Sequence, residues 1–80
     1  MVDRNDLKQW VLEALKELSG SATLLNVIKK VWEKHRREIE VSGDLFFTWQ
    51  YDIRWAATSL RKQKKMKAAK KSPRGVWELS

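Results

Sequence analysis

The sequence predicts a small, mostly helical α+β fold in which three helices precede a C-terminal two-stranded β-hairpin. Three observations lead to this prediction. Apolar side chains recur at the three- and four-residue spacing of a helix in three segments before residue 64. Polar and apolar residues alternate on both sides of a Ser-Pro-Arg-Gly turn near the C-terminus. With 42% hydrophobic residues, the 80 residues can fill one core, so we expect a single domain over residues 1–80.

The first helix is expected from about residue 5 to residue 18. Its inward face consists of apolar side chains at helical spacing: Leu7, Trp10, Val11, Ala14, Leu15 and Leu18. Asp3 or Asn5 can cap its start, and Asp6 suits the positive end of the helix dipole. The Ser-Gly-Ser sequence at residues 19–21 ends it. Capping and solvent exposure account for the acidic residues of this helix.

A second helix is expected from an N-cap at Thr23 to about Glu38. Its inward positions are apolar: Leu24, Val27, Ile28, Val31 and Trp32. Its outer face carries charges at ion-pair spacing and is interpreted as solvated. His35 has no second ligand at metal spacing, so no metal site is expected. A turn signal at residues 42–44 follows, and residues 45–47 (Leu-Phe-Phe) are expected to tuck beneath the fold.

The third helix is expected from Trp49, with Thr48 as its cap, to about Gln63. The inward stripe is formed by Trp49, Ile53, Ala56, Ala57 and Leu60. The opposite face is cationic, with hydroxyl groups among the charges: Tyr51, Arg54, Thr58, Arg61, Lys62 and Lys65. Trp55 lies at the edge between the two faces, where it either packs under the hairpin against Trp77 or is partly open.

The predicted hairpin joins residues 65–68 to residues 76–79. Lys70, Lys71 and Arg74 lie at its tip. These three cations are either phosphate contacts or simply the polar side chains that a hairpin tip requires. We favour phosphate contact because the third helix, which precedes the hairpin, is cationic as well.

The formal net charge of +7 is concentrated in the C-terminal part of the chain. Residues 1–50 contain eight basic and eight acidic side chains, whereas residues 51–80 contain nine basic and two acidic ones. Because the sequence has no cysteine, disulfides and thiolate zinc sites are excluded. No apolar stretch approaches the ~20 residues of a membrane span, so we expect a soluble cytoplasmic protein, nucleoid-associated if bacterial.

Three helices followed by a basic hairpin match the layout of a winged helix-turn-helix. In that arrangement the third helix enters the major groove of DNA, and the hairpin, or wing, lies against phosphates or the adjacent minor groove. The candidate groove residues are Tyr51, Arg54, Thr58, Arg61 and Lys62, and the candidate backbone contacts are Lys70, Lys71 and Arg74. Lys65, on the same face of the third helix, is a further candidate DNA contact. The expected partner is duplex DNA, with no cofactor, metal, membrane or small-molecule substrate.

Two segments resemble a known family. Residues 53–62 (Ile-Arg-Trp-Ala-Ala-Thr-Ser-Leu-Arg-Lys) and residues 72–80 (Ser-Pro-Arg-Gly-Val-Trp-Glu-Leu-Ser) are similar to the N-terminal winged-helix domain of Mrr-type restriction proteins. The resemblance spans most of the chain and implies a DNA-targeting module that is usually joined to a nuclease domain. The sequence departs from the family at residues 63–66 (Gln-Lys-Lys-Met), where a Gly-Leu-Leu type turn is common, and this departure changes how the wing is set.

Other classes of function remain open. A protein-interaction module would show a contiguous exposed apolar patch, with Leu45, Phe46, Phe47 and Trp55 as its candidate residues. RNA binding ranks lower, because single strands are read by exposed aromatics and most aromatics here lie in core stripes. Catalysis by this chain alone is not expected, since no nucleophile–base pair, phosphate loop or metal-ligand cluster is found.

Overall fold

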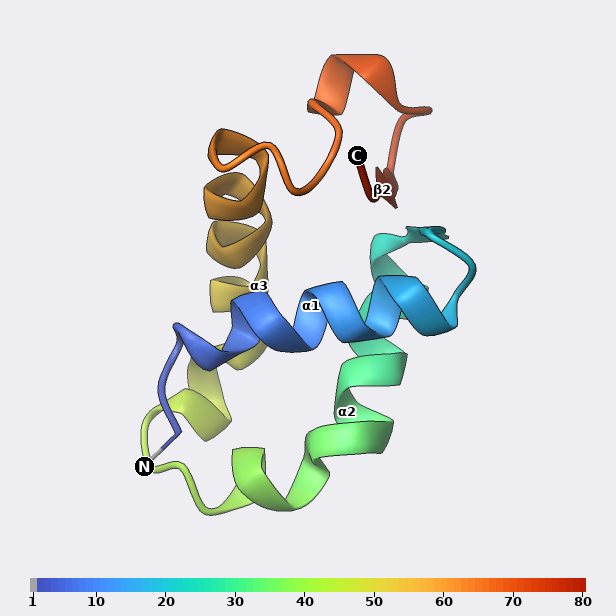
Figure 1. Cartoon of the computed structure of the whole chain (residues 1–80). Coiled ribbons are helices and arrows are strands. Elements are labelled where there is room, and N and C mark those ends of the chain that lie inside the picture. Colours follow the sequence, from blue (N-terminus) through green and yellow to red (C-terminus); the bar gives the residue numbers. More distant parts are fainter. Residues whose placement is uncertain (1) are drawn as a thin grey trace.

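The computed structural model describes residues 2–80, which form three α-helices, a short 3-10 helix and two short antiparallel strands (Figure 1). The elements follow one another as α1 (Asp6–Glu17), β1 (Ser21–Thr23), α2 (Leu24–Glu40), α3 (Leu45–Lys62), η1 (Ala69–Lys71) and β2 (Val76–Glu78). The mostly helical α+β class predicted from the sequence is therefore confirmed, and α1 and α2 lie close to their predicted bounds.

Asp3 caps the start of α1. Its carboxylate accepts a hydrogen bond from the backbone N–H of Asn5 at 2.8 Å, and its own N–H donates to the Asp6 carboxylate at 2.9 Å. Asn5, the alternative cap, makes no side-chain capping bond. At the other end, Ser19 adopts a left-handed conformation with φ 67°, and the N–H of Gly20 donates to the carbonyl of Leu15 at 2.7 Å. The predicted stop signal therefore ends the helix.

The N-cap predicted for α2 is confirmed, because Thr23 Oγ1 accepts a hydrogen bond from the N–H of Asn26 at 3.2 Å. The helix continues to Glu40, with a kink at His35, whose φ of −124° and ψ of 19° are not helical. After the kink, Ile39 is fully buried in the core. The apolar face of α2 therefore reaches one residue beyond the predicted end near Glu38.

The predicted start of α3 at Trp49 is wrong, because the helix begins at Leu45. Thr48 does not act as a cap; it lies inside the helix, where its hydroxyl donates to the Asp52 carboxylate at 2.8 Å. Residues 45–47 do not all tuck beneath the fold either. Consecutive residues point about 100° apart on a helix, so Leu45 is buried while Phe46 and Phe47 are exposed.

The predicted C-terminal hairpin is wrong in its strand partner. β2 pairs with β1, which precedes α2, in the register Ser21 with Glu78, Ala22 with Trp77 and Thr23 with Val76. Residues 65–67 meet the end of β2 through a single bridge between Met66 and Leu79. The turn at Ala69–Lys71 is a 3-10 helix. The alternation of residues 65–68 therefore reflects one buried side chain, Met66, rather than a strand.

A single core lies between the helices and the small sheet. α1 crosses both α2 and α3 in Figure 1, and the side chains it buries are Leu7, Trp10, Val11, Ala14 and Leu15. All the predicted inward residues of α3 are also buried: Trp49, Ile53, Ala56, Ala57 and Leu60. Trp77 of β2 and Met66 close the core near the C-terminus. Within residues 2–80, no helix combines the length and apolarity that crossing a membrane requires.

Candidate nucleic-acid interface

One side of α3 faces away from the core. On a helix with 100° per residue, the side chains of this α3 outer face fall within an arc of about 100° opposite the buried stripe. They are Phe47, Tyr51, Arg54, Thr58, Arg61 and Lys62. All are exposed except Arg61, which is half-buried. The Thr58 hydroxyl donates to the carbonyl of Arg54 at 3.1 Å, so it faces back along its own helix.

The α3 outer face changes character along its length. Phe47 is 82% exposed and Tyr51, one turn later, is 78% exposed, whereas cationic side chains dominate after Arg54. Phe47 was predicted only as part of an apolar protein-binding patch and was missing from the predicted DNA-binding residues, because the helix was expected to start after it. Its position four residues before Tyr51 is the signal that identifies it.

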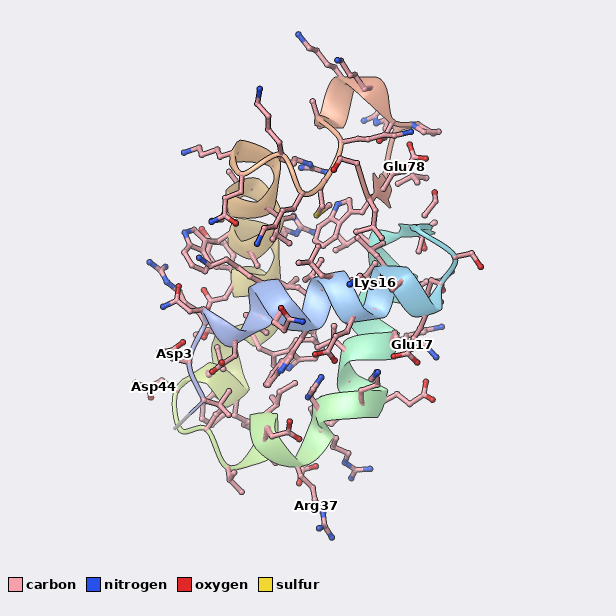
Figure 2. All side chains as sticks on the ribbon, in the orientation of Figure 1. Asp3, Lys16, Glu17, Arg37, Asp44 and Glu78 are labelled. Carbon is pink, nitrogen blue, oxygen red and sulfur yellow. The ribbon has the colours of Figure 1, made fainter. Side chains whose placement is uncertain are left out.

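The basic segment continues beyond α3 as a loop, defined here as the basic loop, residues 64–75. Lys64 adopts a left-handed conformation with φ 62°, and the N–H of Lys65 donates to the carbonyl of Leu60 at 2.9 Å, which ends the helix. Lys65 therefore lies outside α3, contrary to the prediction that it extends the cationic face of that helix. Figure 2 shows long nitrogen-tipped side chains projecting around this orange segment, beyond the C-terminal end of α3.

Most cations of α3 and the basic loop have no carboxylate partner. Among residues 2–80, the ion pair in this region joins Lys67 to Glu78 at 4.0 Å. The cations without an ion pair within that range are Arg54, Arg61, Lys62, Lys64, Lys65, Lys70, Lys71 and Arg74. In contrast, several cations of α2 are paired, as in the contact of Arg36 with Glu40 at 2.6 Å. Unpaired cations on one part of the surface form a positive field that attracts polyanions.

Two hollows lie between the end of α3 and the basic loop. The larger, of about 500 Å³, brings Arg61 of α3 together with Lys70, Ser72 and Arg74 of the loop. The smaller, of about 340 Å³, adds Lys64, Lys67 and Lys71. Of the predicted site residues, Lys62 and Lys65 line neither hollow. Tyr51, Arg54 and Thr58 lie further along α3, towards its start.

Trp77 lines the larger hollow, and the Arg61 guanidinium carbon lies 5.8 Å from the centre of its indole, within cation–π range. Trp55 does not pack against Trp77. It is half-buried beside the start of α1, where the Arg4 guanidinium lies 4.1 Å from the centre of its ring. Of the two positions considered for Trp55, packing under the wing is therefore excluded.

An apolar groove separates α2 from the start of α3. It has a volume of about 330 Å³ and is lined mainly by Ile28, Trp32, Phe46 and Trp49. Trp32 and Trp49 stack at 5.8 Å between ring centres, and Phe46 meets Phe47 edge to face at 5.0 Å. The groove therefore borders the aromatic half of the α3 outer face.

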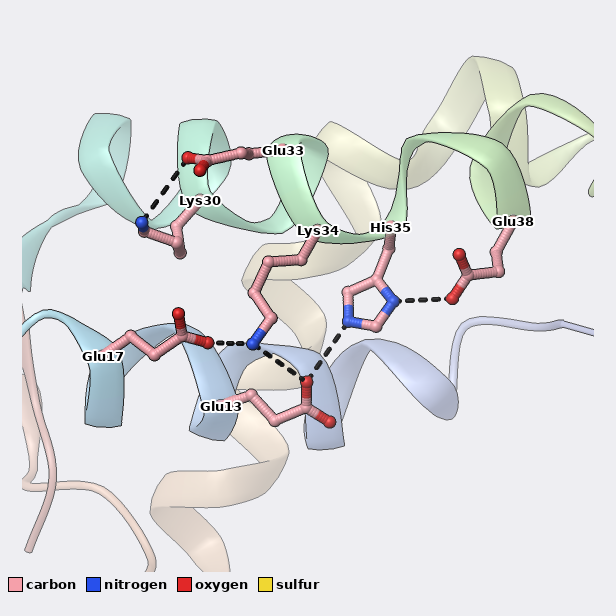
Figure 3. A network of polar contacts seen from close by, with 7 residues as sticks. All are labelled: Glu13, Glu17, Lys30, Glu33, Lys34, His35 and Glu38. Carbon is pink, nitrogen blue, oxygen red and sulfur yellow. Dashed lines mark hydrogen bonds and ion pairs between the residues drawn. The ribbon is translucent and has the colours of Figure 1, made fainter.

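A network of polar contacts joins α1 to α2 (Figure 3). His35 Nδ1 lies 2.7 Å from a Glu38 oxygen and Nε2 lies 3.3 Å from a Glu13 oxygen. Lys34 contacts both Glu13 and Glu17. The interpretation of Glu13 and Glu17 as merely solvated was therefore wrong, because both carboxylates bind side chains of α2 across the helix interface.

Within residues 2–80, no group of three or more His, Asp or Glu side chains is arranged to hold a metal ion. The resemblance to Mrr-type restriction proteins finds no support outside the sequence itself. Comparison with family models, with curated proteins and with solved structures gives no match to this chain, so membership of that family stays a prediction.

Proposed function

We propose that this chain is a non-catalytic winged-helix domain that binds duplex DNA. The observation that carries the proposal is the group of unpaired cations on the end of α3 and on the basic loop. Lys and Arg side chains that neutralise phosphates release counterions from DNA, and this release supplies affinity that depends on salt. A surface of unpaired cations is suited to that role, because no internal carboxylate has to be displaced first.

The order of the elements supports the winged-helix interpretation. The basic loop leaves the end of α3 and returns to β2, which lies beside β1. Backbone hydrogen bonds join the start of the loop to β2 and to the C-terminal residue, from the Lys67 N–H to the Glu78 carbonyl at 2.9 Å and from the Ser80 N–H to the Lys65 carbonyl at 3.3 Å. In this proposal the basic loop takes the place of the wing, although it is not a regular hairpin.

The α3 outer face is the proposed reader of the major groove. Arg54 offers a planar guanidinium, which suits guanine, and the aromatic rings of Phe47 and Tyr51 suit the methyl group of thymine. The cations of the basic loop are assigned to phosphates, which fix position but carry no sequence information. In the same proposal the chain is the targeting module of a restriction-type protein and acts beside a nuclease domain.

The proposal is tested by removing three loop charges and comparing the loss with a matched control. We expect the combined change Lys70→Ala, Lys71→Ala and Arg74→Ala to lower duplex affinity about tenfold or more near 0.1 M salt, equally for all sequences. The slope of log K against log salt should become less steep by about 2 to 3, since each phosphate contact contributes roughly 0.9. Fluorescence anisotropy with labelled duplexes over a salt series measures both quantities.

The control variant removes the same number of charges elsewhere, through Lys16→Ala, Lys29→Ala and Arg37→Ala, all exposed and outside the interface. It should retain most of the affinity and of the slope. Equal losses in the two triple variants would show that DNA responds only to net charge, which contradicts a localised interface.

Protein binding is the second candidate function, and a specific observation favours it. Phe46 is exposed and lines the apolar groove beside Trp32, and the exposed ring of Phe47 contacts Phe46 edge to face. Exposed aromatic side chains at a groove are typical of surfaces that bind other proteins.

A backbone-amide NMR titration with a mixed-sequence duplex separates the two candidates. Salt-sensitive shifts in residues 50–62 and 70–75 favour DNA, whereas no shifts at low salt would exclude DNA and leave protein binding.

A further inference from the structure

The larger hollow between α3 and the basic loop has the properties of an anion site. Its charged and hydroxyl side chains are Arg61, Lys70, Ser72 and Arg74, Trp77 adds an indole N–H, and no carboxylate lines it. Guanidinium and ammonium groups only donate hydrogen bonds, and a hydroxyl can donate as well. The hollow therefore offers several donors from two separate elements and no competing negative charge.

Two atoms at this site lack the partners that buried polar atoms normally have. Arg61 Nε and Ser72 Oγ are both shielded from solvent, and neither forms a hydrogen bond with any group of residues 2–80. Buried polar atoms are satisfied in the great majority of cases, so two unsatisfied atoms in one hollow call for a partner such as a water molecule or a bound ion. Both residues line the same hollow, one on α3 and the other on the basic loop.

The position of Arg61 is fixed by the fold. Its guanidinium lies over the buried indole of Trp77, which belongs to β2. This contact keeps the guanidinium beside the hollow, and a guanidinium carries a planar fork of donors that suits two oxygens of one phosphate. Because the guanidinium lies over the indole, that face of the ring is not open to a nucleobase.

We propose that the hollow lined by Arg61, Lys70, Ser72 and Arg74 binds a single phosphate group. The volume of about 500 Å³ greatly exceeds the ~30 Å³ of one water molecule, so a tetrahedral oxyanion fits together with its remaining hydration. The inference rests on the proposed function where the phosphate belongs to a DNA backbone. A free phosphate monoester has the same recognition chemistry and is the other source.

The first arm of the test titrates the unaltered protein with inorganic phosphate, against chloride at equal ionic strength. The resonances of the Arg61 Nε–H, the Trp77 indole N–H and the Ser72 amide are followed by NMR. We expect these signals to shift in a saturable way with phosphate and not with chloride. Arg61→Lys, which keeps the charge but loses the fork, should weaken phosphate binding about tenfold. Arg37→Lys, the same change at an exposed position of α2 outside the interface, should leave phosphate binding unchanged.

Ser72→Ala should also lower the affinity for phosphate, although it changes no charge. The proposal is overturned if the three resonances of the unaltered protein do not respond to phosphate. It is also overturned if the Arg61→Lys variant is folded and binds phosphate with the affinity of the unaltered protein. The direct titration requires no variant, so the proposal is tested even where a substitution impairs folding.

The second arm adds a duplex without terminal phosphates and separates the two sources. Shifts of the same three resonances on duplex addition assign the site to the phosphodiester backbone. If the three resonances respond to phosphate but no resonance responds to the duplex, the site is supported, its ligand is a free phosphate monoester, and the proposed function is contradicted. If resonances of α3 respond to the duplex but the three resonances of the hollow respond to neither ligand, the phosphate site is contradicted and the proposed function is retained.

Discussion

At the scale of single residues, His35 links the first two helices through its ring. It stacks on Trp10 with 4.0 Å between ring centres and an angle of 8° between planes. Its two nitrogens face carboxylates of different helices, Glu13 of α1 and Glu38 of α2. The backbone of the same residue forms the kink in α2. The His35 side chain therefore combines a ring contact with Trp10 and polar contacts with two carboxylates.

Stability should depend on pH through Glu38. The hydrogen bond from His35 lowers the pKa of the Glu38 carboxyl from its usual 4.5 and outweighs the opposing desolvation. A lowered folded-state pKa stabilises the fold above the unfolded pKa, and this stabilisation is lost as the pH falls through the folded pKa. We expect Glu38→Gln to be less stable than the unaltered protein at pH 6, with the difference shrinking as the pH falls below 4.5 and disappearing once the pH is below the lowered folded-state pKa.

Urea unfolding followed by tryptophan fluorescence from pH 3 to pH 7 measures this difference. Glu40→Gln serves as a control, because Glu40 pairs with Arg36 on the surface and has no contact with His35. A constant difference between Glu38→Gln and the unaltered protein over the whole range would contradict the assignment.

At the scale of elements, both α1 and α3 end in a left-handed residue that is not glycine. Ser19 follows α1 with φ 67°, and Lys64 follows α3 with φ 62°. An L-residue in this conformation brings its Cβ close to the following carbonyl oxygen, a strain that glycine avoids. The helix ends are therefore fixed by hydrogen bonds to the last carbonyls, against a local conformational cost.

Replacing Ser19 with glycine should stabilise the fold. Glycine relieves the left-handed strain, but it also increases the conformational entropy of the unfolded chain. We therefore expect the free energy of unfolding to rise by about 0.5–1 kcal/mol. Chemical denaturation gives the free energy of unfolding directly. Ser19→Ala is the control, since alanine also has a Cβ and should bring no such gain. Equal stabilisation by alanine would show that the strain at this position is not the cause.

At the scale of the whole molecule, apolar side chains have two different roles. Ile53 is fully buried in the core, whereas Phe47 on the same helix projects into solvent. The stability of an 80-residue domain is the small difference between large opposing terms, roughly 0.05–0.15 kcal/mol per residue. One core cavity therefore removes a large share of it, while loss of an exposed ring removes little.

We expect Ile53→Ala to lower the free energy of unfolding by about 2–5 kcal/mol, which is the range for truncation of a fully buried branched side chain. Phe47→Ala should change it by at most about 0.5 kcal/mol. Denaturant unfolding of both variants tests the contrast. A large loss of stability in Phe47→Ala would mean that this ring supports the fold, and would remove it from the candidate interface.

The sequence by itself determined the three helices, the Thr23 cap, most of the core and the position of the excess charge. Helical spacing and capping are local properties, so Ile53, Ala57 and Leu60 could be assigned to the core from their spacing alone. Formal charge is likewise set by composition, so the concentration of cations after residue 50 was visible before the fold was known.

Only the tertiary structure decided the partner of β2, the exposure of Phe47 and the meeting of Arg61 with Ser72. A three-residue strand has too little pattern to specify its neighbour, so the placement of β1 beside the C-terminus by the packing of α1 and α2 selects the pair. Phe47 became exposed because α3 starts four residues earlier than its local cap signal indicated. Arg61 and Ser72 are eleven residues apart, and the turn of the chain between them depends on Met66 and Trp77 in the core. Contacts of this kind are formed by the packed molecule as a whole, and no local pattern encodes them.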